Sequence, residues 1–388
     1  MASSSTVQNN RRVNYNTAHV NRVVKTMNPY EKLASVLDTI PNGFPPAEDG
    51  SHLRVLEWIF TPEEAELASQ LKLRGETLDE LATRLNRPSE ELEKQLDLMR
   101  EKGQINSWVS KSAGARKYGL LPFAVGIYEE QLNRMDAELA QLLEQYFSNE
   151  TGFRKLAKTK PVIFQVIPVN QSVSTELEIH SLEKAEELIE SSASWGVRDC
   201  ICRKQKDLIG EGCDYPREVC IAFAPNKKNA FDDDELTKSI TKEEALRLLR
   251  VAEEAGLIHC TYNVQSGRTF ICNCCTCCCG VLRGVEKLEN PREYIKTDFI
   301  MTVNADLCTG CESCVDRCQF DALSVPEDVC IVDTKRCIGC GVCAIVCPED
   351  ALGLIRDESP GRPGQPANQL DWMTQRAISR GVDPSDIM

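Results

Sequence analysis

The sequence predicts an α+β protein whose parts follow one another along the chain. Three observations predict it: capped amphipathic helices fill the first third, cysteines are concentrated after residue 199, and a stretch near the C-terminus repeats with an offset of 29 residues. At 388 residues the chain is long enough for two or three domains. We expect these parts: an extended arm (1–30), a helical domain ending in a β-wing (31–125), a cysteine-rich α/β domain (126–290), a duplicated βαβ-type module (291–356), and a linker with a docking tail (357–388).

Three helices and a pair of strands are predicted after residue 60. Thr61 precedes a proline and two glutamates, which is typical of a helix N-terminus. Thr77 and Glu80 form a capping box, and a third helix runs over 89–102 with apolar residues on one face. Strands around Trp108 complete the pattern of a winged-helix-like domain.

Charge argues against nucleic acid as the partner of that domain. The chain carries a net charge of −14, and its predicted recognition helix, 89–102, has five acidic residues against three basic ones. A helix that enters the major groove needs the opposite balance, because DNA is a polyanion. We therefore expect a structural or protein-docking role for this domain and no nucleic acid.

Further elements are expected between the first domain and the C-terminus. Amphipathic spacing predicts helices over 126–148, 175–191 and 241–256, and an apolar run predicts a strand over 161–169. A Pro/Gly-rich linker precedes a short amphipathic helix at 368–380, which we expect to dock on the chain itself or on a partner.

The cysteine content indicates the compartment. Twenty cysteines occur without the apolar core of a signal peptide, and no apolar run is long enough to span a membrane. Disulfides are rare in reducing compartments, where thiols remain available to soft metals. We expect a cytoplasmic protein with no membrane span.

Eight of the cysteines form two runs of identical spacing, C-x2-C-x2-C-x3-C, with Pro348 behind the second run. The three closely spaced cysteines of each run can reach three irons of one cubane cluster, whereas the fourth turns away from it. The internal repeat extends beyond the cysteines, since Val303 matches Val332. The alternative is a pair of zinc sites, because thiolates at C-x2-C also bind zinc. The two runs are Cys308, Cys311, Cys314 and Cys318, and Cys337, Cys340, Cys343 and Cys347.

This stretch resembles the bacterial two-[4Fe–4S] ferredoxins, in which the fourth cysteine of each run ligates the other cluster. The resemblance implies one cluster on Cys308, Cys311, Cys314 and Cys347, and a second on Cys337, Cys340, Cys343 and Cys318. One departure is visible, because Gln319 stands where that family has a proline. The substitution removes no ligand.

A second set of cysteines lies between residues 200 and 279. One group comprises Cys200, Cys202, Cys213 and Cys220, and the other is a dense run that includes Cys272, Cys274, Cys275, Cys277 and Cys278.

We expect these two groups to hold two further [4Fe–4S] clusters. In one arrangement Cys272, Cys275 and Cys278, spaced C-x2-C-x2-C, share a cluster with one thiolate of the first group, and the rest of that group joins Cys274 or Cys277. In the other, the first group holds one cluster alone. Zinc and redox-active dithiols are the alternatives. Arg203 lies close enough in sequence to raise a cluster's potential.

The whole arrangement resembles multi-cluster iron–sulfur proteins of anaerobes, which combine a winged-helix-like N-terminal region, a similar cysteine-rich region and a two-cluster ferredoxin module. The resemblance implies an electron-transfer subunit with about four [4Fe–4S] clusters in a relay between a redox donor or acceptor and the catalytic subunit of a larger oxidoreductase. No catalytic residues stand out, and no nucleotide-binding glycine motif is present, so a flavin or ferredoxin partner would be another chain. The alternatives are a redox-sensing DNA-binding regulator and a catalytic iron–sulfur subunit.

Overall fold

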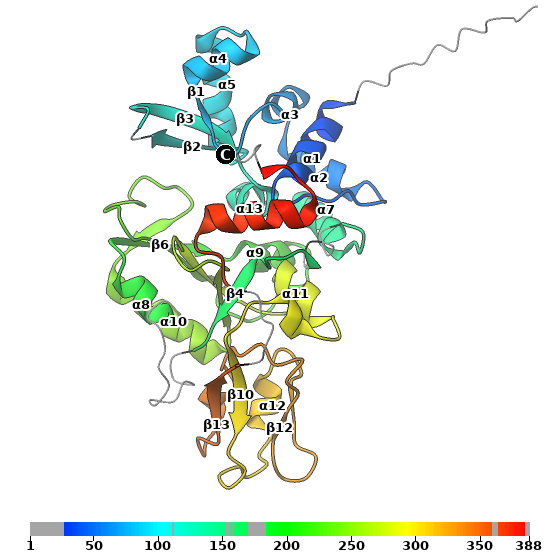
Figure 1. Cartoon of the computed structure of the whole chain (residues 1–388), viewed down its shortest axis with the longest axis vertical. Coiled ribbons are helices and arrows are strands. Elements are labelled where there is room, and N and C mark those ends of the chain that lie inside the picture. The colour runs from blue at the N-terminus through cyan, green and yellow to red at the C-terminus, as the bar shows by residue number, and fades with distance from the viewer. Residues whose placement is uncertain are drawn as a thin grey trace, which may run out of the picture.

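The computed structural model describes residues 27–110, 112–152, 156, 158–169, 184–358 and 364–384. It confirms the mixture of helices and sheets. A helical N-terminal part lies at one end, a six-stranded sheet lies in the middle, and the duplicated module lies at the other end (Figure 1). Most of the predicted arm lies outside the described residues, and the first helix already begins at Pro29.

The N-terminal part begins with helices that are fixed by their caps. Thr61 and Glu64 form a capping box, as do Thr77 and Glu80, so both predicted helix starts are confirmed. Three short strands follow or interrupt the helices and form a sheet in the order β1-β3-β2. The elements are α1 (Pro29–Thr39), α2 (Ser51–Ile59), α3 (Pro62–Ala68), β1 (Glu76–Thr77), α4 (Leu78–Leu85), α5 (Ser89–Glu101), β2 (Ile105–Ser110) and β3 (Ala115–Leu120).

The predicted single helix over 126–148 is wrong. An irregular segment (Phe123–Ile127) leads into a short turn, α6 (Tyr128–Glu130), and a separate helix, α7 (Ala137–Ser148), begins at the side-chain cap of Asp136. The Asp136 carboxylate accepts a hydrogen bond from the Leu139 amide at 2.8 Å, which starts a new helix instead of continuing the old one.

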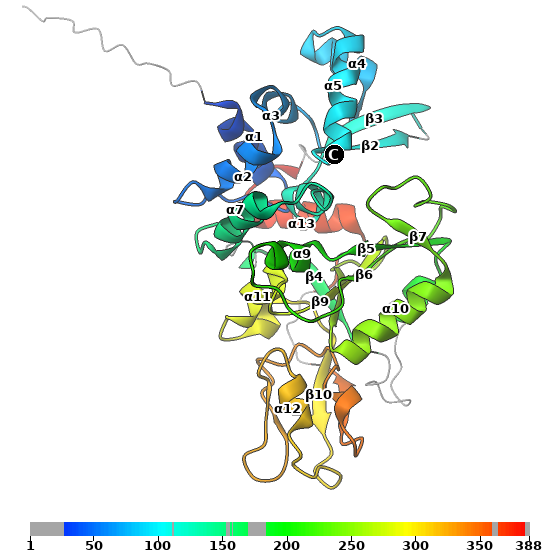
Figure 2. The ribbon, with the colours of Figure 1, turned by 180° about the vertical axis from the view of Figure 1, so that it is seen from behind.

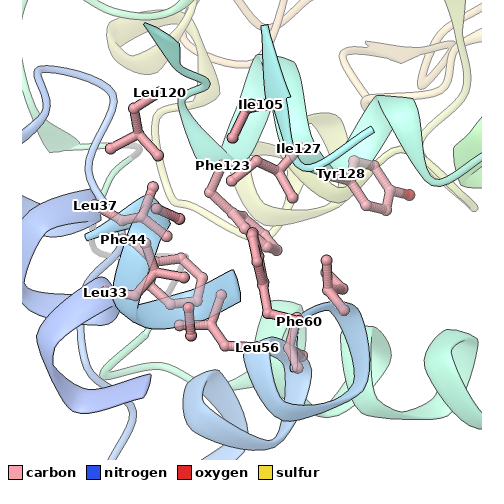
Figure 3. Close-up of a cluster of buried hydrophobic side chains, with 14 of the residues drawn as sticks. Leu33, Leu37, Phe44, Leu56, Phe60, Ile105, Leu120, Phe123, Ile127 and Tyr128 are labelled. Carbon is pink, nitrogen blue, oxygen red and sulfur yellow. The ribbon is translucent and has the colours of Figure 1, made fainter. Parts of the chain in front are cut away.

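One apolar core joins all of the N-terminal helices. The rings of Phe44 and Phe123 lie next to each other in this core (Figure 3), with centroids 4.5 Å apart. The centroid of the Tyr146 ring lies 4.9 Å from that of Phe44. Leu33 and Leu56 from α1 and α2 are fully buried in the same cluster. Tyr146 belongs to α7, so this core extends past the predicted domain boundary at residue 125.

The middle part is an antiparallel sheet in the order β4-β8-β9-β6-β5-β7. Its strands are β4 (Phe164–Ile167), β5 (Ser194–Asp199), β6 (Glu218–Ala224), β7 (Lys238–Ile240), β8 (Ile258–Tyr262) and β9 (Phe270–Cys274). The strand predicted over 161–169 is therefore shorter at both ends. Of the helix predicted over 175–191, residues 175–183 lie outside the described part, and α8 (Ala185–Glu190) covers most of the remainder.

The two faces of this sheet differ. Ile221, Phe223 and Ile271 pack on one face with α8 and α10 (Lys242–Ala255). Because side chains alternate along a strand, Cys220 and Cys272 point to the opposite face. That face meets the beginnings of α9 (Ile201–Leu208) and α11 (Gly280–Glu286), close to α7 (Figure 2).

The C-terminal module has the internal symmetry that its repeat predicts. Strand β10 (Phe299–Val303), helix α12 (Ser313–Arg317) and strand β11 (Leu323–Ser324) are followed by β12 (Ile331–Val332), a single helical turn and β13 (Leu352–Arg356). Val303 pairs with Leu352 and Leu323 pairs with Val332. Adding 29 to the first residue of each pair gives Val332 and Leu352, so the two pairings exchange under the repeat.

The C-terminal helix α13 (Gln369–Arg380) docks on the chain itself, between the N-terminal part and the sheet (Figure 1). Trp372 and Arg376 are fully buried. The Arg376 guanidinium donates to the carbonyls of Pro41, Leu156, Thr159 and Pro161 at 2.7–3.1 Å. None of the described helices is long and apolar enough to cross a membrane.

Candidate iron–sulfur centres

Two small cavities in the C-terminal module are lined by four of the repeat cysteines each. Each cavity has a volume of about 20 Å³. The first is lined by Cys308, Cys311, Cys314 and Cys347, and the second by Cys318, Cys337, Cys340 and Cys343. Each cavity thus combines three closely spaced cysteines of one run with the fourth cysteine of the other run.

The backbone prepares both cavities for thiolate sulfur. The amide of Ala322 donates to Sγ of Cys318 at 3.4 Å, and the amide of Ala351 donates to Sγ of Cys347 at 3.3 Å. These two bonds are equivalent under the 29-residue repeat. Amide N–H groups directed at sulfur stabilise its negative charge and raise a cluster's reduction potential.

The thiols of the second cavity are withdrawn from solvent and converge on one small space. Burial raises the pKa of Cys340 to about 12, and it also raises the pKa values of Cys318 and Cys343. A thiol with a raised pKa keeps its proton at neutral pH unless a bound cation replaces that proton. Buried thiols that converge on one small cavity are therefore suited to iron.

Cys330, which lies between the two runs, borders the first cavity. Its Sγ lies 3.6 Å from Sγ of Cys314, and its amide donates to Sγ of Cys308 at 3.3 Å. Sequence spacing gave no reason to place a fifth thiol there. The position follows from its place immediately before β12, which carries it back beside the first run.

A compact group of four thiols lies at the end of the sheet. The Sγ atoms of Cys213, Cys275, Cys277 and Cys278 all lie within 4.8 Å of one another. Among the described residues, no other set of three or more metal-binding side chains is as compact. Zinc bound at about 2.3 Å by four thiolates separates them by about 3.8 Å, so this group accepts a single tetrahedral ion directly and a cubane after its thiols spread.

Six other thiols surround a much larger cavity of about 450 Å³. The side-chain interactions that shift their pKa values join them in a closed ring, in the order Cys200, Cys202, Cys279, Cys274, Cys272 and Cys220. We call this set the six-thiol ring. Cys279 is a member that the sequence analysis left out.

The structure does not bring Cys272 together with Cys275 and Cys278. Cys272 and Cys274 lie on strand β9, where residues two apart share a face, so both face the large cavity. Cys275 and Cys278 lie in the turn that follows the strand and face the compact group. The spacing C-x2-C-x2-C crosses the end of a strand, and the two-residue period of that strand decides which thiols meet.

The structure does not bring Cys200, Cys202, Cys213 and Cys220 together as one group either. Cys213 belongs to the compact group, and the other three belong to the six-thiol ring. The ring is completed by Cys279, which precedes α11 as its N-cap, just as Cys200 precedes α9. The positive ends of both helices therefore favour thiolate charge.

Arg203 lies between the compact group and the six-thiol ring. It is 1% exposed, and its guanidinium lies 3.7 Å from Sγ of Cys275 and donates to the Asn273 carbonyl at 3.1 Å. Hydrogen bonds from Cys277 and Cys278, together with the charge of Arg203, lower the pKa of Cys275 to about 2. A buried cation at this position stabilises negatively charged ligands on both sides.

Gln319 joins the C-terminal module to the compact group. Its side-chain oxygen accepts from the amide of Thr276 at 2.8 Å, and its side-chain nitrogen donates to the Gly256 carbonyl at 2.5 Å. Thr276 lies between Cys275 and Cys277, and Gln319 follows Cys318 directly. The departure from proline noted in the sequence thus forms a contact between two cysteine sites.

Comparison with known proteins supports the iron–sulfur assignment in the C-terminal module. A family model described as "4Fe-4S binding domain" matches residues 301–324 and 330–353. A curated "Probable ferredoxin" from Methanosarcina thermophila is 53% identical over 30 residues, which are 8% of this chain and 52% of that protein. The chain thus spans about half the length of this relative. No solved structure matches the chain significantly. The module therefore contains two 4Fe-4S binding domains of the ferredoxin type, and the chain is an iron–sulfur protein with at least two [4Fe–4S] clusters.

Proposed function

We propose that this chain is an electron-transfer subunit that carries about four [4Fe–4S] clusters in a relay. The observation that supports the proposal is the hydrogen bond from the Thr276 amide to the Gln319 side chain. Gln319 follows Cys318 of a ferredoxin-type site and Thr276 lies between Cys275 and Cys277 of the compact group, so this bond connects the two sites. The bound clusters would supply one-electron chemistry. The protein would hold them in series and limit their access to solvent.

The proposed order runs from the six-thiol ring to the first ferredoxin site. Arg203 connects the ring to the compact group, and Gln319 connects the compact group to the site that contains Cys318. Within the module, Cys318 of the first run lies at the site of the second run, and Cys347 of the second run lies at the site of the first. Each step of the relay thus corresponds to a contact between neighbouring cysteine sites.

The end of the relay at Cys308, Cys311, Cys314 and Cys347 is the one that we propose for a partner protein. Cys311 is exposed, and Leu307 and Ile331 are large apolar residues with exposures of 47% and 54%. Exposed acidic residues lie beside them, including Asp306 and Glu327. An apolar centre with an acidic rim suits a basic redox partner. We propose that this partner is a flavin protein, a ferredoxin or the catalytic subunit of an oxidoreductase.

We also propose that residues 62–120 form a winged-helix unit that docks to protein and does not bind nucleic acid. The order of elements supports the first point, since β1 lies between α3 and α4, β2 and β3 follow α5, and the three strands form one sheet. Helix α5 supports the second, since Glu90, Glu93 and Glu101 are exposed on it. The domain boundaries given above remain part of this proposal. All twenty cysteines lie in the described part of the chain and none of them forms a disulfide there, which supports a cytoplasmic location.

Metal analysis of the anaerobically purified full-length chain tests the proposal. Four [4Fe–4S] clusters require about 16 iron and about 16 sulfide per chain, with no zinc. A content of about 12 iron and one zinc per chain would mean that the compact group holds a single zinc ion instead of a cluster, which would interrupt the proposed relay there. About 8 iron would leave only the ferredoxin sites and would refute the relay.

A further inference from the structure

The cavity beside the six-thiol ring is far larger than a cluster site needs. Measured in the same way, each ferredoxin-type site encloses about 20 Å³, whereas this cavity encloses about 450 Å³. Even two clusters of that kind would leave most of the space free. The volume is within the range of roughly 300–1,000 Å³ that is typical of small-molecule sites.

The walls of the cavity are mainly apolar and aromatic. Phe147 comes from α7, Phe164 from β4, Phe270 from β9, and Phe231 from the loop between β6 and β7. Four rings from four separate elements favour a flat, apolar molecule. Phe231 is half-buried and packs close to Gly196, so the β6–β7 loop forms one side of the opening.

The charged groups at the cavity do not form an anion site. Arg198 lines it, but its guanidinium is paired with Glu130 at 2.8 Å and with Asp234 at 3.3 Å. Two carboxylates therefore offset its charge, and Asp199 adds another negative group to the lining. An anionic ligand would meet net negative charge in a poorly solvated site, which is unfavourable.

One polar group is held in position on the wall. The Glu129 carboxyl lines the cavity, and its Oε2 accepts from the Gly126 amide at 2.6 Å. Burial raises the pKa of Glu129 to about 7, so below that pH the carboxyl keeps its proton. A protonated carboxyl can donate a hydrogen bond to an uncharged acceptor such as a carbonyl oxygen.

We propose that this cavity binds a neutral, mainly apolar carbonyl compound, with its rings among the four phenylalanines and its carbonyl oxygen facing Glu129. The molecule would lie against the six-thiol ring, among the apolar side chains that line the cavity. The proposal concerns binding and does not depend on the electron relay.

Calorimetric titration of the metal-loaded full-length chain under anaerobic conditions tests the proposal. The probes are 2-acetylnaphthalene, which is a neutral ketone, and 2-naphthoate, which has the same rings and a negative charge. We expect the ketone to bind at least roughly tenfold more tightly than the carboxylate at pH 6.5. Equal affinity, or no binding of the ketone, would overturn the proposal.

Substitutions locate the bound probe. Ala222 lies on the cavity face of β6, so Ala222→Leu should fill part of the space and weaken ketone binding roughly tenfold. Ala113→Leu adds the same side chain on the exposed loop between β2 and β3 and should leave binding unchanged.

If Ala222→Leu fails to bind its full metal content, two further variants still test the proposal. Phe231→Lys and Glu129→Ala, both at residues that line the cavity, should also weaken binding of the ketone. If neither variant changes the affinity of a chain with full metal content, the probe binds elsewhere and the proposal fails. Metal content measured on each sample separates this outcome from failure of the relay.

Discussion

Two charged residues at the cysteine sites should influence how the protein responds to pH and at which potential it is reduced. Glu129 and Arg203 are these two residues, because Arg203 is buried beside Cys275 and Glu129 is half-buried in the wall of the large cavity. Neither residue belongs to a recognisable sequence motif. The sequence places Arg203 beside the first cysteine group, but its contact with Cys275 and the position of Glu129 at the cavity depend on distant segments.

Glu129→Gln should change the pH dependence of stability. The pKa of Glu129 is raised by burial to about 7, so the wild-type carboxyl is neutral in the folded chain below that value. Stability from this group is present below the unfolded pKa and is lost as pH rises through about 7. Glu130 raises the pKa of Glu129 further and Arg198 opposes the rise, but burial is the largest cause.

Thermal unfolding at pH 5 and pH 8 measures this effect. The glutamine variant should resemble the wild type at pH 5 and should be more stable at pH 8, by roughly 2 kcal/mol. Glu138→Gln, on an exposed part of α7, serves as the control. A constant difference between variant and wild type at both pH values would contradict the raised pKa.

Arg203→Met should lower the reduction potential of the centre that Cys275 helps to hold. The methionine keeps much of the side-chain volume but removes a buried positive charge 3.7 Å from sulfur. If the lost interaction is worth about 1.4 kcal/mol, the potential should fall by roughly 60 mV. EPR-monitored redox titration measures it, with Arg250→Met on the exposed side of α10 as the control. An unchanged potential would show that Arg203 has only a packing role.

At the scale of elements, the contact between the module and the sheet depends on one side chain. Gln319→Pro restores the residue that two-cluster ferredoxins have at this position, and the backbone before it is already extended, with φ −79° and ψ 112° at Cys318. The variant should retain its ferredoxin-type clusters. It should lose both hydrogen bonds to Thr276 and Gly256.

Amide hydrogen exchange tests this directly. The Thr276 N–H, which donates to Gln319 in the wild type, should exchange roughly tenfold faster in the variant, which is the effect of losing about 1.4 kcal/mol of protection. Pro348→Gln changes the equivalent position of the second run and should leave Thr276 unaffected. Unchanged protection of Thr276 in Gln319→Pro would mean that this hydrogen bond does not join the two parts.

The docking of α13 is a second contact at the scale of elements. Arg376→Met should release the tail, because four buried carbonyl groups would lose their donor, at a cost on the order of 3–5 kcal/mol. Limited proteolysis should cleave the variant near residue 365 much faster than the wild type. Ile378→Ala, at a side chain that is 63% exposed on the same helix, should behave like the wild type.

At the scale of the whole molecule, the net charge of −14 should govern encounters with redox partners. The reduced chain should react faster with a cationic oxidant such as hexaammineruthenium(III) at low salt than at high salt. The Debye length falls from about 30 Å at 0.01 M to about 8 Å at 0.15 M, so screening weakens the attraction. Stopped-flow rates for ferricyanide should change in the opposite direction, and the same trend for both oxidants would contradict electrostatic steering.

Features that depend on residues close together in the chain could be predicted from the sequence. The helix starts at Thr61 and Thr77 depend on a side chain and an amide three residues apart. The two ferredoxin-type sites follow from short fixed spacings and one duplication, and the exchange of pairing between Val303 and Val332 follows from the same repeat.

Contacts between residues from distant segments became known only from the three-dimensional structure, because they depend on how the segments pack. The division of the cysteines in 200–279 depends on where strand β9 ends, and on the approach of Cys213 and Cys279 from other segments. In the sequence, Gln319 is only a departure from the proline of the ferredoxin family, whereas in the structure its side chain forms hydrogen bonds with Thr276 and Gly256. The walls of the large cavity come from many separate elements, and its volume depends on how they pack, which no local pattern in the sequence encodes.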